Sequence, residues 1–365
     1  MCRWDNSLIL KINPETIIHL TIKIMKTKIK IILLASILSL GANAAVLTVN
    51  NSPAGGAQYA QINSAIAAAN AGDTVYVNGN LAPYANAIIS KSITLIGAGT
   101  FTKKQSLFPS MVGSISFIGG ISNVTIRGFM ITTGINGFGN GNISFVTITD
   151  NYFTGVALDY ASIVNVHDIV VSNNVHTGGG YFTNVYNGAG CYNFLIENNL
   201  INGRIENFNI ASSTIQNNTF YNCGNAFSNS TTAVSGIMIK NNIFYNSHPS
   251  NGTSGCIFLN NISFNSSGTY PSLGGSNIDN TDPQLINVGA SGGYSESYNF
   301  NTQNTSPAKN AGTDGTDLGY YGGVMKVSVL GEPQNVPVVR QMDIENTNVL
   351  QGGNIDVKVR STKAR

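Results

Sequence analysis

The side chains best suited to chemistry gather in the middle of the chain, where aromatic rings accompany a few charged groups. They are Asp159, Tyr160, Tyr181, Tyr186, Arg204 and Glu206. Aromatic rings can pack against sugar rings, while charged groups anchor the hydroxyls. Arg204 and Glu206 flank Ile205, so both project outward if Ile205 points into a core. The cluster predicts a glycan-binding groove, and the alternative interpretation is a set of scattered surface tyrosines with one ion pair.

The histidines near this cluster lack the spacing of a metal site. His167 precedes Asp168 in a candidate strand, His248 precedes Pro249 in a candidate loop, and His176 stands alone. Zinc sites need three or four ligands at characteristic intervals. Neither a phosphate-binding Walker loop nor a nucleophile elbow occurs in the sequence. We therefore predict no metal site and no resident cofactor.

A repeat positions these residues. An apolar strand runs into a polar pair, Asn-Asn or Asp-Asn, in the segments 146–151, 169–174, 194–199, 213–218, 237–242 and 257–261, and a degenerate copy occupies 124–129. The last apolar residue before each pair falls at positions 126, 148, 171, 196, 215, 239 and 258. Successive copies are thus 19 to 25 residues apart.

The repeat predicts a solenoid. Each copy alternates apolar and polar residues, so it has one face that only stacked neighbours can bury. The variable spacing excludes a strict six-residue repeat, and the Ile, Val and Asn pattern excludes leucine-rich repeats. We predict an all-β fold, a right-handed parallel β-helix. In the pairs, Asn tolerates positive φ at the bend, and stacked amides form a hydrogen-bonded ladder.

Stacking places residues of equal position in columns, about 4.8 Å apart per coil. The column directly after the aligned apolar residues contains Glu197 and Lys240, two coils apart, and it is typical of a solvated sheet face. Counted from the aligned residue, Asp159 stands at +11, and Tyr181 and Glu206 both stand at +10. We therefore expect these last three side chains in approximate register on one side of the coils.

Both ends of a β-helix need a cover, since open coils expose unpaired strand edges. Residues 59–69 have helical spacing of apolar residues and predict a short helix over the first coil, and 74–77 and 92–97 predict early strands. Residues 354–360 alternate cleanly and predict a strand or hairpin that seals or straps the last coil. We divide the chain into a leader (1–44), a β-helix (45–323) and a C-terminal β tail (324–365).

The N-terminus has the pattern of a signal peptide. A basic start at 25–30 precedes an apolar run, 31–40, and a small-residue cleavage site that ends at Ala44. The run is shorter than the roughly 20 residues that span a bilayer, so we expect no transmembrane segment in the mature chain. Residues 1–24 are interpreted as an over-long start, with Met25 as the initiator. The sequence therefore predicts export.

Composition narrows the class of protein. Charged residues make up 10% of the 365 residues, and the chain has 49 Asn and 40 Gly, which are poor helix formers. Regularly spaced Val, Ile, Leu and Phe argue against disorder. Removal of the leader changes the net charge from +2 to −2, so no basic field remains to hold nucleic acid. Three cysteines remain, which is no disulfide framework; we expect them buried, in a monomeric protein.

Together with the Asn-paired coils, residues 61–77 and 93–97 resemble exported proteins of the pectin lyase-like β-helix superfamily. Residues 282–285, 306–312 and 317–320 resemble the closing segment of many bacterial members. The resemblance covers about residues 46–323 and implies a protein that is secreted or held at the surface of a bacterium. It implies a fold more than an activity, because members include lyases, hydrolases, epimerases and adhesins.

The resemblance also supplies the catalytic alternatives. A lyase of this superfamily removes a proton beside a uronate carboxylate with Arg or Lys and often uses Ca²⁺. Arg204 or Lys240 would then be the base, and Asp159 and Glu206 would be acids or Ca²⁺ ligands. No segment matches the paired acids of the galacturonan hydrolases.

Clustered charge is scarce, so the function we predict is binding of a polysaccharide or cell-surface glycan, without evident catalysis. A lyase or hydrolase acting on a uronate-containing polymer, and a structural adhesin, are the alternatives.

Overall fold

The structure is a computed structural model. It describes residues 44–52, 56–99, 108–187, 189–228, 234–249, 252–266, 274–289, 292–324, 337–344 and 357–363. The predicted signal peptide therefore lies, apart from Ala44, outside the described residues.

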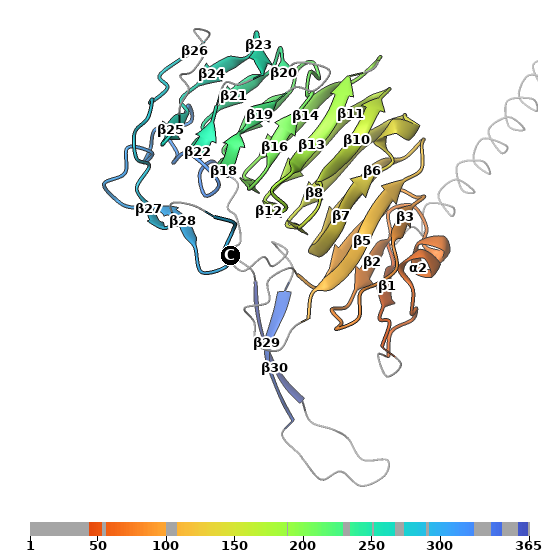
Figure 1. Ribbon diagram of the computed structural model, residues 1–365. Coiled ribbons are helices and arrows are strands. Elements are labelled where there is room, and N and C mark those ends of the chain that lie inside the picture. The colour runs from red at the N-terminus through yellow and green to blue at the C-terminus, as the bar shows by residue number, and fades with distance from the viewer. Residues whose placement is uncertain are drawn as a thin grey trace, which may run out of the picture. The chain divides into compact units, whose positions relative to one another are not determined.

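Parallel strands stack into a β-solenoid, whose coils contribute strands to sheets named A, B and C; only some of the coils have a strand in sheet C (Figure 1). Among the described residues, sheet A has eleven strands: β1 (Val46–Val49), β2 (Thr74–Val77), β4 (Thr94–Gly97), β6 (Ser122–Arg127), β8 (Ile143–Thr149), β11 (Val166–Ser172), β14 (Tyr192–Glu197), β17 (Thr214–Gln216), β21 (Met238–Lys240), β24 (Ile257–Leu259) and β26 (Gly274–Gly275).

In the part of the chain that the structure describes, sheet B has nine strands: β3 (Ala87–Ile89), β5 (Ser110–Phe117), β7 (Phe129–Asn136), β9 (Tyr152–Phe153), β12 (Val175–His176), β15 (Leu200–Ile201), β18 (Thr219–Asn225), β22 (Ile243–His248) and β25 (Ile262–Phe264). Sheet C has four within the same described residues: β10 (Leu158–Ile163), β13 (Tyr181–Asn187), β16 (Arg204–Glu206) and β19 (Phe227–Ser228). A parallel pair, β20 (Val234–Ser235) and β23 (Thr253–Ser254), and a 3₁₀ turn, η1 (Phe138–Asn140), complete the coils.

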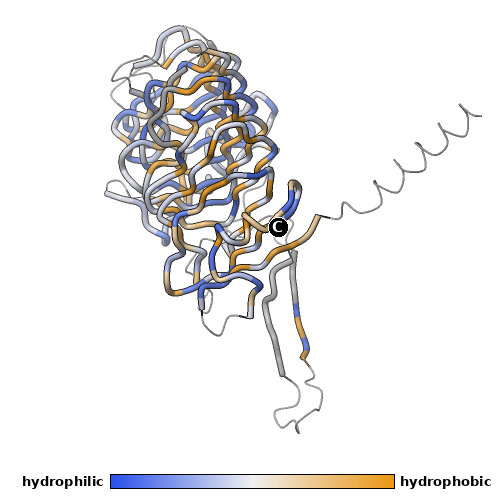
Figure 2. Tube along the Cα trace, turned by 90° about the vertical axis from the view of Figure 1, so that its right-hand side faces the viewer, coloured by the Kyte–Doolittle hydropathy of each residue, from blue (hydrophilic) through white to orange (hydrophobic). Residues whose placement is uncertain are grey.

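The predicted column of aligned apolar residues is confirmed. In sheet A, Ile126 pairs with Ile148, and the series continues through Val171, Ile196, Ile215 and Ile239 to Phe258. All seven side chains are fully buried. The alternation seen along the coils in Figure 2 follows from the period of two, which points every second side chain inward. Stacking thus supplies the burial that one copy lacks.

The bend from sheet A to sheet B, here named the ladder corner, uses the paired polar residues as predicted. The first residue of each pair has φ between +50° and +58°, from Asp150 to Asn260. The second residues form the ladder: Asn151, Asn174, Asn199, Asn218, Asn242 and Asn261, followed by Asn277. Each Nδ2 donates to the next Oδ1 at 2.9–3.2 Å, and each backbone N–H donates to the same oxygen at 2.8–3.0 Å. These amides are satisfied internally and act as scaffold.

The predicted N-terminal helix is α2 (Ile62–Ala68), which lies against β1, β2 and β3. It buries Ile62, Ala65 and Ile66. At the other end, β29 (Pro337–Ile344) and β30 (Val357–Lys363) form an antiparallel hairpin within the predicted tail. Whether this tail seals or straps the last coil is not tested by the described residues, and it stays a prediction.

Residues 306–323 form a strap along the ladder corner. Asn260 donates to the carbonyl of Ala311, Asn241 exchanges two hydrogen bonds with Thr313, and Asn198 donates to Tyr320 and Gly322. The same C-terminal region covers outward-facing residues of sheet B. The strands β27 (Leu285–Asn287) and β28 (Asn299–Thr302) form an antiparallel hairpin there. Phe300 of β28 packs with Leu318 and Tyr320 in one buried cluster that also contains Val175, Leu200 and Ile243.

Candidate functional site

Four residues on sheet C form what we name the Tyr181 cluster: Tyr181, Arg204, Glu206 and Ser228. Adjacent strands place Tyr181 opposite Arg204, and Glu206 opposite Ser228. The Arg204 guanidinium lies 4.5 Å from the centre of the Tyr181 ring. Its Nε donates to Glu206 Oε2 at 2.9 Å, and Ser228 Oγ donates to the same oxygen at 2.9 Å. The predicted ion pair and its aromatic neighbour are therefore in contact.

The charges in this cluster are held in place. The Arg204 side chain is 37% exposed, whereas that of Glu206 is 3% exposed. Burial lowers the pKa of Arg204, but hydrogen bonds to Glu206 and Tyr181 outweigh it and leave the pKa above its ordinary value. A guanidinium held in its charged form is a poor general base. The cluster is built to present a fixed cation beside an aromatic ring.

Two details of the sequence prediction are wrong. Tyr181 does not stand level with Glu206, because the residue opposite Glu206 is Asn184. The register shifts between Tyr181 and Thr183, and such an irregularity cannot be counted from coil lengths. Glu206 is also buried rather than exposed to solvent, because Arg204 and Ser228 close over its carboxylate.

For three of the remaining predicted residues the structure gives the strand but not the position of the side chain. Asp159 and Tyr160 lie in β10, and Tyr186 lies in β13; these two strands pair in sheet C. Lys240 lies in β21 of sheet A and is not brought to the cluster. Its predicted column is confirmed, since Glu197 pairs with Gln216 and Gln216 with Lys240.

His176 belongs to the interior, although it occurs between the surface candidates in the sequence. It points into the coil in register with Phe153 and Ile201, with its ring edge-on to Phe182 at 5.6 Å. Burial lowers the pKa of His176 to about 4. The side chain is therefore neutral at physiological pH and packs as part of the core.

Sequence reasoning missed a second surface, on the outer face of sheet A. A second bend lies near the start of the sheet A strands, and it is here named the open corner. It also has positive φ, at Asn123, Phe145, Asp168, Asn193, Ser212, Gly236 and Gly255. Each of these residues stands three positions before an aligned apolar residue. Reading that column along the repeat is the signal that would have revealed the surface.

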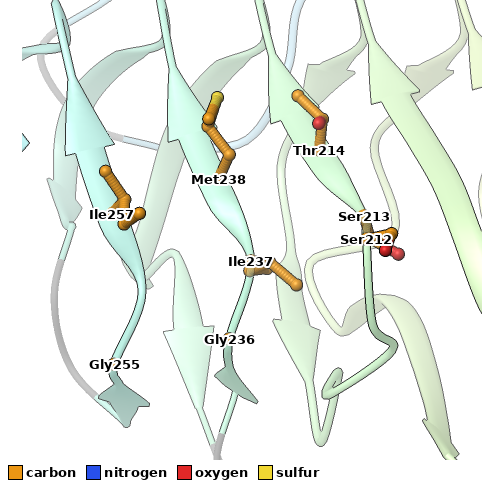
Figure 3. Close-up of a pocket in the computed structure, with 8 residues that line it drawn as sticks. All are labelled: Ser212, Ser213, Thr214, Gly236, Ile237, Met238, Gly255 and Ile257. Carbon is orange, nitrogen blue, oxygen red and sulfur yellow. The ribbon is translucent and has the colours of Figure 1, made fainter.

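Two shallow depressions lie along this corner. One, of about 310 Å³, is lined by residues from Phe145 to Leu195. The other, of about 340 Å³, is lined by residues from Ser212 to Ile257. Figure 3 shows Thr214, Met238 and Ile257 projecting from successive strands beside the bends at Ser212, Gly236 and Gly255. The two depressions continue each other, because Leu195 pairs with Thr214 across β14 and β17.

In the described part of the chain, no three His, Cys, Asp or Glu side chains converge as metal ligands. No helix in that part is long and apolar enough to span a membrane. Cys191, Cys223 and Cys256 are free thiols; the first and last are buried, and the other is half-buried.

No family model matches the chain, and no curated protein matches it.

Proposed function

We propose that this protein is an exported β-helix protein of the pectin lyase-like superfamily, which binds a polysaccharide or a cell-surface glycan at the Tyr181 cluster. The observation that carries the proposal is the stacking of the Arg204 guanidinium on the Tyr181 ring, with Nε held by buried Glu206. A fixed ring with a fixed cation stacked on it offers a sugar both aromatic surface and hydrogen-bond donors.

The hydrogen-bond inventory favours binding over catalysis. A guanidinium has five N–H donors, and Glu206 accepts the one on Nε. The other four N–H groups are at the two terminal nitrogens, and the Tyr181 hydroxyl does not accept all of them. Donors therefore remain for sugar hydroxyls or a uronate carboxylate. Glu206 Oε2 already accepts two hydrogen bonds in a buried position, which suits a structural anchor better than a proton shuttle.

A glycan array with the mature chain, residues 45–365, tests the binding proposal. We expect Tyr181→Ala and Arg204→Ala to weaken binding to the best glycans at least tenfold, because each removes half of the stacked pair. Lys240→Ala removes a cation from sheet A and serves as the matched control. Unchanged binding by both cluster variants, with circular dichroism like that of the wild type, would refute this site.

A second assay separates binding from uronate cleavage. The protein is incubated with uronate polymers and Ca²⁺ while the absorbance of unsaturated chain ends is followed. We expect no increase above the blank. An increase that disappears in Arg204→Ala would replace the binding proposal with the lyase alternative.

A further inference from the structure

Phe145 occupies a conformation that bulky residues avoid. Its φ is +54°, and the residue is 55% exposed. Left-handed backbone costs a residue with a Cβ about 1–2 kcal/mol, and little burial of the Phe145 ring repays that cost. The other residues described at the open corner are Asn, Asp, Ser and Gly. A strained and exposed aromatic residue indicates a role at the surface.

Phe145 begins a row of rings on three successive coils. Its ring meets that of His167 edge-on at 5.9 Å, and His167 stacks on Tyr192 at 4.7 Å with 3° between the planes. Tyr192 is 45% exposed, and its partner on the next coil is Ala211, which has only a methyl group to set against the ring. The row Phe145–His167–Tyr192 therefore ends in a ring with one face open to a ligand.

Polar groups stand beside the aromatic row. His167 Nδ1 and Asp168 Oδ2 are 2.8 Å apart, and Asn193 donates to the other oxygen of Asp168. These hydrogen bonds, first that of His167 and then that of Asn193, lower the pKa of Asp168. The carboxylate is therefore a fixed acceptor at the edge of the depression, and a neighbouring amide is oriented by it.

The charge of this surface selects among glycans. Residues of the first depression include one carboxylate, Asp168, and neither Lys nor Arg. Its floor is Thr147, Val170 and Leu195, and the second depression continues it with Thr214 and Met238. A uronate polymer would bring its carboxylates to Asp168, and the lining of neither depression includes a Lys or Arg to pair with them. Neutral sugars meet only apolar surface, amide and a single acceptor.

We propose that the outer face of sheet A is a second binding site, for a neutral polysaccharide that runs across the strands. A sugar ring stacks on Tyr192, its hydroxyls bond to Asp168 and Asn193, and the chain extends over Thr214 and Met238. The site shares no residue with the Tyr181 cluster, so it stands whether or not that cluster binds glycans.

Affinity electrophoresis tests this site, with the mature chain run through gels containing soluble neutral glucans, mannans or galactans, or uronate polymers. We expect a neutral polymer to retard the wild type. Tyr192→Ala and Phe145→Gly should weaken that retardation at least tenfold, and Tyr192→Phe should keep it because the ring remains. Ile286→Ala, which removes an exposed apolar side chain from β27, is the matched control and should be retarded like the wild type.

Three results would overturn the proposal: a wild type that no neutral polymer retards, retardation by uronate polymers alone, or retardation that survives both Tyr192→Ala and Phe145→Gly. Phe145→Gly keeps the test meaningful, since glycine relieves the backbone and a loss of binding would not come from unfolding.

Discussion

Each of the middle coils enters the left-handed region at both ends of its sheet A strand, and the two bends have different residues. At the ladder corner the bends from Asp150 to Asn260 are all Asp or Asn, with φ of +50° to +58°. At the open corner φ reaches similar values, yet the residues range from Phe145 to Gly255. The backbone conformation is therefore not what restricts the residue type.

The contacts of the side chains explain the difference. At the ladder corner the second residue is an amide inside the core, and the first binds the strap at Asn198, Asn217, Asn241 and Asn260. At the open corner Phe145 and Tyr192 face solvent, and Asp168 accepts hydrogen bonds from two neighbours at the same corner, His167 and Asn193. Hydrogen bonds to the ladder and the strap restrict the residue types at the ladder corner. The side chains of the open corner lack that restriction and can act at the surface.

The largest effect should come from breaking the ladder. Asn199→Leu leaves the donors of Asn174, the carbonyls of Val171 and Glu197, and Asn218 Oδ1 short of a partner. Each unpaired buried group costs about 1–3 kcal/mol, so we expect at least about 4 kcal/mol of lost stability in urea unfolding. Asn193→Gly, at the open corner, should cost less than about 1 kcal/mol. Equal losses would contradict the distinction between the corners.

Acid should lower the stability of the fold through the buried His176. Its folded pKa of about 4 lies below the ordinary 6.5, so between these values the unfolded chain binds the proton that the fold excludes. This contribution is complete above pH 6.5 and falls by about 3 kcal/mol as the pH drops to 4. Melting temperatures from pH 4 to 7 measure it. His176→Gln should remove that pH dependence, whereas His167→Gln, at the open corner, should leave it in place.

The strap can be tested at a single ladder-corner residue. Asn241→Gly keeps the bend but removes both hydrogen bonds to Thr313, and we expect a loss of about 1–2 kcal/mol. Limited proteolysis should then cut within 306–323 faster than in the wild type. Asn123→Gly, at the open corner, is the control and should change neither measurement. Equal cleavage of both variants would show that Asn241 does not hold the strap.

The smallest effect has the opposite sign. Phe145→Gly should raise the stability by about 0.5–1 kcal/mol, because relief of the left-handed strain exceeds the entropy that glycine adds to the unfolded chain. Phe145→Ala keeps the Cβ and should gain less. Thermal unfolding measures both variants. A destabilised glycine variant would mean that the exposed ring contributes packing, and the strain argument for a surface role would then fail.

The sequence predicted the coils well and the surface poorly. Ile148, Val171 and Ile196 align as expected because burial and the amide ladder fix their register in every coil. Sheet C follows a stretch of variable length, so counting placed Tyr181 beside Glu206 instead of Arg204. The sequence analysis missed the open corner because its residue types vary from coil to coil. Its residues share only their position, three residues before the aligned apolar residue, and not a residue type.

By itself the sequence determined the solenoid, its aligned core, its ladder, the helix α2 and the β hairpin of the tail, because period-two burial and repeated asparagine act within a few residues. Tertiary structure alone decided that Glu206 is buried, that residues 306–323 bind the ladder corner, and that Phe145, His167 and Tyr192 form one row. Such contacts join residues about 20 to 120 positions apart, where coil length and local bulges, rather than local pattern, set which side chains meet.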